Sequence, residues 1–127
     1  MISPFLTIGT SPKRGRGIFA TKNIKKGTVI EISPVIVLTE KERKTIEGTL
    51  LFHYVFEWGK DAKQGIVALG YVSMYNHSSP SNCEYEMEYG KKRMTIKTVK
   101  NIKKGEELFI NYNAVPDDKT KVWFDAT

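Results

Sequence analysis

The chain has 127 residues, the usual size of one domain with a single core, so a two-domain enzyme is not expected. With 40% hydrophobic and 27% charged residues, its composition is that of a folded globular protein and excludes a disordered, collagen-like or membrane-embedded chain. The formal net charge of +6 raises nucleic acid or another polyanion as a partner.

The excess of positive charge lies in one repeated segment. The hexapeptide Lys-Asn-Ile-Lys-Lys-Gly occurs at residues 22–27 and again at 100–105, and its six lysines equal the whole net charge. A run of five or six like charges, which marks many binding tails, is absent from the sequence. Whether the two copies lie side by side is open at this point, so nucleic acid is an alternative partner and not the expected one.

Short segments rich in branched and aromatic residues, separated by glycine and proline, predict a mostly β domain with little helix. The predicted strands cover residues 16–20, 28–32, 35–38, 53–58, 65–69, 83–89, 93–99 and 107–110. A capping box of Thr39 and Glu42 predicts one helix, which is expected to end near Glu47. Each repeat ends in a glycine before a strand, so both copies are expected to be turns with that glycine at positive φ.

The chain has one cysteine and two histidines, which limits the disulfides and metal sites that it can form. Cys83 is the only cysteine, so an intramolecular disulfide is excluded and a reducing compartment is expected: the cytoplasm, or the nucleus if the source is a eukaryote or its virus. One thiol with His53 and His77 cannot provide a four-ligand zinc site without carboxylates, so no metal is expected. Neither a signal peptide nor a membrane-spanning segment is predicted.

Polar side chains are densest at residues 75–83, Tyr-Asn-His-Ser-Ser-Pro-Ser-Asn-Cys. Such a segment either forms a solvated loop or lines a polar pocket, because a core could not pair all of its polar groups. A Ser-His hydrolase is not favoured, because the side chains of the adjacent His77 and Ser78 point apart and the sequence contains no Gly-x-Ser-x-Gly motif.

Four motifs now occur in one order along most of the chain. They are Gly-Arg-Gly-Ile-Phe-Ala at residues 15–20, Glu31, Asn-His-Ser at 76–78 with Pro80 to Cys83 after it, and Glu-Glu-Leu-Phe-Ile-Asn-Tyr at 106–112. In this order they resemble the motifs of SET-domain protein-lysine methyltransferases, of the small kind without zinc-binding flanking regions. The resemblance implies a SET-domain (β-clip) fold, with several short-stranded sheets and a C-terminal pseudoknot in which the end segment passes under the loop around Asn76.

The resemblance also implies the reaction. S-adenosyl-L-methionine would bind on one face, a lysine of a protein substrate would enter by a narrow channel from the other, and S-adenosyl-L-homocysteine would leave as product. The neutral amine would attack the sulfonium methyl group in line, so the channel has to lower the lysine pKa from its ordinary value of about 10.4. Residues 1–113 would form the SET domain, and residues 114–127 a tail of the same domain that closes over the site.

By resemblance, roles can be assigned residue by residue. Tyr112 would be the catalytic tyrosine; without the motif it would be a buried core tyrosine. Cofactor binding falls to Gly15, Arg16, Gly17, Asn76, His77 and Trp123. His77 could instead only fix the loop, Arg16 could act through its backbone alone, and Trp123 or Phe124 could anchor the tail or form a dimer contact. The substrate channel would contain Tyr85, Tyr54 and Ala114, with core packing as the alternative for Tyr54 and Trp58.

Two positions depart from the family pattern. Ser73 stands where an arginine is common, so the cofactor carboxylate must be held by another group. Ala114 stands where an aromatic residue often limits methylation, so di- or trimethylation would fit if it lines the channel. Glutamates at 84, 86 and 88 alternate with Tyr85 and its apolar neighbours, which suits a basic peptide as well as a solvated strand edge.

The expected partner is a protein with a lysine in a basic or flexible segment, such as a histone-like, nucleoid or ribosomal protein, and no membrane partner is expected. A homodimer is left open. The alternative function is a catalytically inactive SET-like module that binds a partner protein or nucleic acid through Lys25 and Lys26 and through Lys103 and Lys104.

Overall fold

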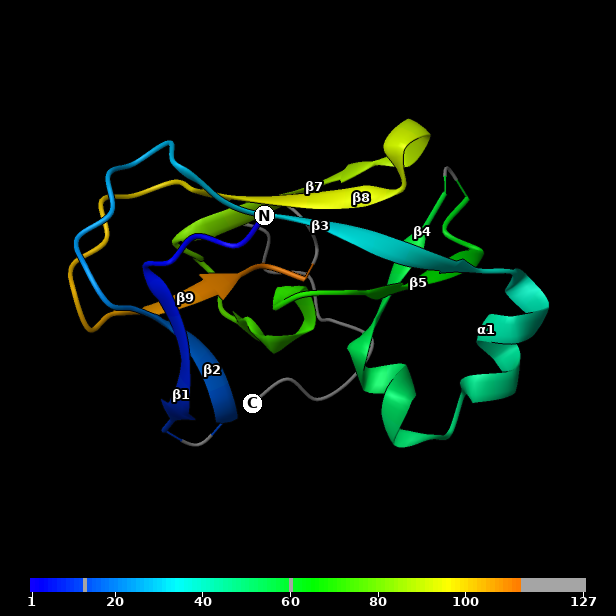
Figure 1. Ribbon diagram of the computed structural model, residues 1–127. Coiled ribbons are helices and arrows are strands. Elements are labelled where there is room, and N and C mark those ends of the chain that lie inside the picture. Colours follow the sequence, from blue (N-terminus) through cyan, green and yellow to red (C-terminus); the bar gives the residue numbers. More distant parts are fainter. Residues whose placement is uncertain (13, 60, 113–127) are drawn as a thin grey trace.

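The computed structural model describes residues 1–12, 14–59 and 61–112; Ala114, Trp123 and Phe124 lie outside these ranges. Its strands are β1 (Leu6–Ser11), β2 (Gly15–Ala20), β3 (Val29–Leu38), β4 (Val55–Trp58), β5 (Gln64–Ala68), β6 (Asn76–His77), β7 (Cys83–Glu88), β8 (Arg93–Thr98) and β9 (Glu107–Ile110). The helices are α1 (Glu40–Ile46) and the single 3₁₀ turns η1 (Leu50–Tyr54), η2 (Val72–Met74) and η3 (Tyr89–Lys91). The predicted mostly β fold with little helix is confirmed (Figure 1).

The described strands form two sheets. The first has the order β1-β2-β9-β6, and the second has the order β4-β5-β3-β8-β7. In the first sheet β9 lies antiparallel to β2 and parallel to the two-residue strand β6. This parallel pairing joins two segments that lie about thirty residues apart in the chain, and it is the contact that assembles the site described below.

The long strand β3 replaces two predicted strands, at 28–32 and 35–38. It pairs with β8 from Val29 to Pro34 and with β5 from Val35 to Leu38, so it changes partner at the proline. Proline has no N–H to give to a ladder, and a change of partner is a position where this costs little. The sequence-based break at Ser33 and Pro34 therefore marks a change of partner and not the end of a strand.

The structure differs from the predicted strands in three other places. Strand β1 was not predicted, because most of its residues are not buried and its hydrophobic pattern is weak. Strand β6 was not predicted because it contains only two residues. The strand predicted over 53–58 begins at Val55, since the preceding residues form the 3₁₀ turn η1.

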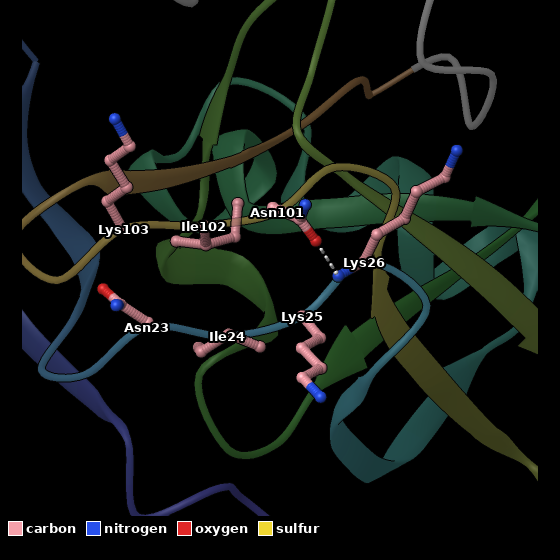
Figure 2. A pocket seen from close by; sticks show the side chains of 7 residues that line it. All are labelled: Asn23, Ile24, Lys25, Lys26, Asn101, Ile102 and Lys103. Atoms are coloured by element: carbon pink, nitrogen blue, oxygen red, sulfur yellow. Dashed lines mark hydrogen bonds between the residues drawn. The ribbon is translucent and has the colours of Figure 1, made fainter.

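Both lysine-rich hexapeptides are turns, as predicted: residues 22–27 connect β2 to β3, and residues 100–105 connect β8 to β9. Their final glycines, Gly27 and Gly105, have φ values of 84° and 92°. The two turns pair with each other through an antiparallel bridge between Ile24 and Ile102. Figure 2 shows the paired segments and the pocket that their side chains line.

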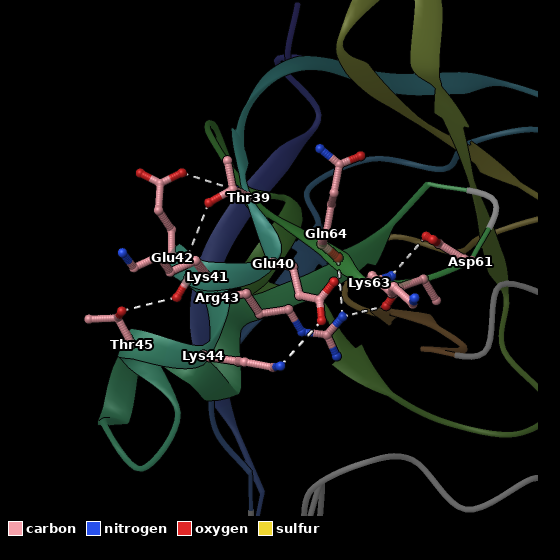
Figure 3. Close-up of polar contacts among 11 residues, drawn as sticks. Thr39, Glu40, Lys41, Glu42, Arg43, Lys44, Thr45, Asp61, Lys63 and Gln64 are labelled. Carbon is pink, nitrogen blue, oxygen red and sulfur yellow. Dashed lines mark hydrogen bonds and ion pairs between the residues drawn. The ribbon is translucent and has the colours of Figure 1, made fainter.

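Helix α1 begins at the predicted capping box, in which the Thr39 hydroxyl accepts from the Glu42 N–H and the Glu42 carboxylate accepts from the Thr39 N–H. The helix has no buried residue, and Arg43 connects it to the β4–β5 hairpin by donating to the carbonyl groups of Ala62 and Gln64 (Figure 3). It ends at Ile46 with Glu47 as C-cap, close to the predicted end.

The core combines branched aliphatic side chains with aromatic ones such as Phe56, Trp58 and Tyr75. Its most completely buried members include Ile18, Ile30, Ile66, Ile96, Leu108 and Ile110. Nothing in the described part of the chain forms a helix that is long and apolar enough to span a membrane.

Candidate active site

The pairing of β6 with β9 brings the Asn-His-Ser motif beside the end segment. Asn76 lies opposite Phe109 and His77 opposite Ile110. Just past β9, the Tyr112 N–H donates to His77 Nδ1 over 3.1 Å. Tyr112 and His77 are therefore neighbours although they are 35 residues apart, with their ring centroids 5.2 Å from each other.

The Tyr112 side chain is held by ring contacts with Phe56 and His77 and by a hydrogen bond of its hydroxyl. Its hydroxyl donates to the Tyr75 carbonyl over 2.7 Å, and the edge of the ring packs against Phe56 with the centroids 5.9 Å apart. Burial, followed by the nearby phenol of Tyr54, raises the pKa of Tyr112 well above its ordinary value. Tyr112 is therefore a neutral phenol whose proton is directed to a backbone carbonyl.

Glu31 supports this arrangement from the core. Its carboxylate is fully buried and accepts from the Tyr75 hydroxyl at 2.8 Å, from the Ser33 hydroxyl at 2.6 Å and from the Tyr71 N–H at 2.7 Å. Burial, and then the carboxylate of Glu31, raise the pKa of Tyr75. Tyr71 and Tyr75 flank η2, so Glu31 fixes both ends of the turn that leads into the Asn-His-Ser motif.

Two of the three predicted channel residues lie near Tyr112. The Tyr85 hydroxyl, on β7, donates to the Tyr112 carbonyl over 2.8 Å, and its ring packs against Phe56 at 5.5 Å. Tyr54 ends η1 with 40% of its surface exposed, so the core-packing alternative is wrong for this residue. Ser73, which stands in place of the family's arginine, donates its hydroxyl hydrogen to the Tyr54 carbonyl over 3.0 Å.

The structure also shows the positions of Trp58 and of the glutamates on β7. Trp58 is buried in the core and packs against Tyr89, as the core alternative predicted. Strand β7 is an edge strand of its sheet. Glu84 forms an ion pair with Lys97 and Glu88 one with Arg93, both on the neighbouring strand β8, so two of the three glutamates already have partners within the sheet.

The Asn76 side chain connects β6 to strands β9 and β2 of the same sheet. Its Nδ2 group donates to the Arg16 carbonyl over 3.0 Å and to Glu107 Oε2 over 2.8 Å. A Cβ at Gly17 would lie 2.5 Å from Glu107 Oε2 and 2.8 Å from Asn76 Nδ2, so any larger residue there would displace these two side chains. Glu107 was not predicted as a site residue; its position in the end-segment motif was the available signal.

The edge of β2 offers backbone groups to a ligand. Strand β2 pairs with β9 only at Ile18 and Phe19, so on that side residues 15–17 have no partner strand, although the Arg16 carbonyl accepts from Asn76. Just after β6, the hydroxyl of Ser79 is buried and has no hydrogen-bond partner among the described residues. An open strand edge and an unsatisfied hydroxyl beside the Asn-His-Ser motif fit a ligand rich in polar groups, as S-adenosylmethionine is.

Arg14, which the sequence analysis did not identify as a site residue, lies near Phe109 and His77. The guanidinium of Arg14 stands over the Phe109 ring, 5.3 Å from its centroid. Burial, and then the charge of Arg14, lower the pKa of His77, so the imidazole is neutral at neutral pH. A neutral imidazole is required here because Nδ1 accepts a hydrogen bond from the backbone of Tyr112. Trp123 and Ala114, the remaining predicted site residues, lie outside the described residues.

The fold and this site define a methyltransferase of the SET type. The family model of the SET domain matches residues 15–113, and the chain belongs to that family. The chain is 34% identical over 121 residues to the histone-lysine N-methyltransferase of Schizosaccharomyces pombe that is specific for H3 lysine-37, covering 94% of this chain and 77% of that enzyme. It is 32% identical over 111 residues to histone-lysine N-methyltransferase 2B of Homo sapiens, covering 82% of this chain but 4% of the human protein.

Solved structures agree with this assignment. The crystal structure of a Plasmodium falciparum candidate histone methyltransferase has a TM-score of 0.69 and 31% identity, and covers 87% of this chain and 95% of that one. Polycomb repressive complex 2 of Chaetomium thermophilum, bound to S-adenosylmethionine, has a TM-score of 0.72 over 91% of this chain and 16% of its own; at 22% identity the likeness is one of fold.

The prediction of an S-adenosylmethionine-dependent protein-lysine methyltransferase with a SET fold is thereby confirmed. The pseudoknot stays a prediction, because residues 113–127 lie outside the described part of the chain.

Proposed function

We propose that this enzyme methylates a lysine in a histone or histone-like basic protein, with Tyr112 as its catalytic residue. The observation that carries the proposal is the pairing of β6 with β9, which puts Tyr112 beside His77. Asn76 lies on β6 as well, and β2, with its open edge, is the other neighbour of β9 in the sheet. A substrate-facing phenol and a polar ligand-binding edge thus adjoin each other, which methyl transfer between two bound molecules requires.

The polar edge is the proposed cofactor site. S-adenosylmethionine, when bound, supplies a methyl group on a positively charged sulfur. Backbone groups of residues 15–17, together with Asn76, His77 and the unsatisfied hydroxyl of Ser79, would hold its polar parts. Arg14 is the proposed partner of its carboxylate, in place of the arginine that Ser73 replaces, because its guanidinium lies over Phe109 beside β6.

The aromatic side is the proposed lysine site. The Phe56 ring packs against both Tyr85 and Tyr112, and these three rings would surround the hydrocarbon stem of the lysine. An amine placed among such groups loses hydration, which lowers its pKa and favours the neutral nucleophile. The Tyr112 hydroxyl donates to the Tyr75 carbonyl, which fixes the phenol in the position where it would orient the amine.

The proposed substrate class rests on the relatives, of which the fission-yeast enzyme methylates histone H3. In this chain the edge strand β7 next to Tyr112 exposes Glu86 and carries the paired Glu84 and Glu88, which gives a basic peptide an acidic strand to lie along. That Ala114 leaves room for di- or trimethylation stays a prediction, because this residue lies outside the described part of the chain.

The test separates binding from turnover in two variants and their matched controls. Tyr112→Phe is expected to keep S-adenosylmethionine binding in calorimetry and to lose most methyl transfer to histone H3, while Tyr89→Phe, at an exposed phenol, keeps both. Asn76→Ala is expected to lose cofactor binding, while Asn101→Ala, which also removes an amide from a backbone contact, keeps it. Full turnover by Tyr112→Phe would reject the catalytic assignment, and unchanged binding by Asn76→Ala would reject the cofactor site.

A further inference from the structure

The two lysine-rich turns, which methyl transfer does not use, form a single structure that we call the double turn (residues 22–27 and 100–105). It lies at the end of the molecule opposite α1 (Figure 1). Ile24 and Ile102 exchange two backbone hydrogen bonds, each of 2.8 Å. The two copies are identical in sequence and are joined at the same residue of each copy.

The side chains repeat this symmetry. Asn101 Oδ1 accepts from the Lys26 N–H over 2.8 Å (Figure 2). Asn23 Oδ1 accepts from the Lys104 N–H over the same distance. At the ends, the Gly27 N–H donates to the carbonyl of residue 98 and the Gly105 N–H to the carbonyl of residue 20, each two residues before the other copy. The double turn therefore has local twofold symmetry, and its backbone is held by hydrogen bonds in both copies.

This backbone presents a concentrated positive charge. All six of its lysines, at 22, 25, 26, 100, 103 and 104, are exposed. Among the described residues none of the six forms an ion pair, and Lys22 alone has a ring contact, with Phe5 at 5.1 Å. The one carboxylate next to the copies, Glu106, accepts from the backbone N–H of Lys103. The cations and anions in the rest of the chain are equal in number, so the net charge of the chain equals the charge of the double turn.

We propose that the double turn binds the phosphodiester backbone of double-stranded nucleic acid without sequence preference. Lysine ammonium groups on a fixed backbone are suited to phosphates, and such binding is mainly electrostatic. Side-chain oxygens that could read base edges, those of Asn23 and Asn101, are occupied by the opposite turn. The proposal is independent of the methyltransferase site, to which neither hexapeptide contributes a residue.

Two other polyanions fit the surface less well. Single-stranded nucleic acid is bound largely by stacking on exposed aromatic rings; the hexapeptides contain none, and the 37% exposed ring of Phe5 is in contact with the Lys22 ammonium group. An acidic protein would be expected to meet an apolar or aromatic centre within the patch, but Ile24 and Ile102 are buried at 5% and 2% exposure. A duplex, which needs only charge at the surface, remains the best match.

The experiment measures binding of the full chain to a fluorescein-labelled DNA duplex of random sequence by anisotropy, without cofactor. The wild type is expected to bind with a dissociation constant of about 1 to 100 μM that rises steeply between about 50 and 200 mM salt. The variant K25Q/K26Q/K103Q/K104Q is expected to bind at least about tenfold more weakly at low salt, with the slope of log affinity against log salt smaller by about 3 to 4.

The matched control removes the same charge elsewhere. The variant K41Q/K63Q/K91Q/K92Q changes four exposed lysines, which lie on α1, in the β4–β5 connection, at the end of η3 and directly after η3. None of the four belongs to an ion pair of the described residues. It is expected to keep binding within about twofold of the wild type, because the attraction acts at the contact and is screened beyond about 10 Å.

Four results would overturn the proposal: no binding by the wild type at low salt, an equal loss in the two quadruple variants, stronger binding of polyglutamate than of the duplex, or preference for single-stranded DNA of equal length. The third would assign the surface to an acidic protein, and the fourth would assign it to single strands. Methylation of a free histone peptide is measured in parallel and is expected to be unchanged in both variants, so failure of the methyltransferase assignment would be seen separately.

Discussion

Glu31 provides a quantitative test of how the site is held. Its carboxylate accepts three hydrogen bonds at 2.6 to 2.8 Å with no surface exposed, and Glu31→Gln replaces one accepting oxygen by a donating NH₂ group. The amide oxygen can keep the bonds of Ser33 and Tyr71, but the NH₂ group then faces the Tyr75 hydroxyl, whose proton loses its acceptor. Hydrogen bonds to charged groups contribute about 1.5 to 3 kcal/mol each, and an unsatisfied buried donor costs about 1 to 3 kcal/mol.

We therefore expect Glu31→Gln to lower the free energy of unfolding by about 2 to 4 kcal/mol, measured by urea denaturation. For a chain of this length that corresponds to a Tm lower by about 8 to 15 °C. The matched control is Glu40→Gln, which removes the charge of an exposed ion pair with Lys44 on α1 and is expected to cost at most about 0.5 kcal/mol. Equal free energies of unfolding for the two variants would refute the role assigned to Glu31.

Three further predictions follow from the site. Because the folded protein lowers the pKa of His77, the corresponding stability is present above about pH 6.5 and is lost as the pH falls through the folded pKa; an NMR titration in which His77 protonates above its ordinary pKa would contradict this. Burial raises the pKa of the Cys83 thiol to about 12, so maleimide at neutral pH should label it only after unfolding, and rapid labelling of the native protein would be inconsistent with its position. Gly17→Ala places a Cβ against Glu107 and is expected to weaken S-adenosylmethionine binding at least about tenfold in calorimetry; unchanged binding would show that the β2 edge is not used.

Local features of the fold could be predicted because they depend on neighbouring residues. The capping box of Thr39 and Glu42 determines where α1 begins, and the final glycines of the hexapeptides determine the turns. The change of partner at Pro34 could not be predicted, since a proline in a β-rich segment equally indicates a strand end. Strand β6 could not be predicted either, because a two-residue strand has no period of its own.

The site was predicted through motifs and not through geometry. The motifs identified Tyr112, Asn76 and His77, but nothing local indicates that the Tyr112 backbone donates to His77 or that its hydroxyl meets the Tyr75 carbonyl. These contacts join residues more than thirty positions apart and arise from the parallel pairing of β6 with β9. The same limit applies to the double turn, whose two copies are identical in sequence but gave no sign that they pair.

The most direct test of the central claim is where the methyl group goes. Wild-type enzyme is incubated with histone H3 and S-adenosylmethionine carrying a deuterated methyl group, and the product is mapped by tandem mass spectrometry. We predict deuterated methyl groups on the side-chain nitrogen of a lysine and their near absence with Tyr112→Phe, which still binds the cofactor. Label on another residue type, or equal label with Tyr112→Phe, would contradict the proposed lysine methyl transfer at Tyr112.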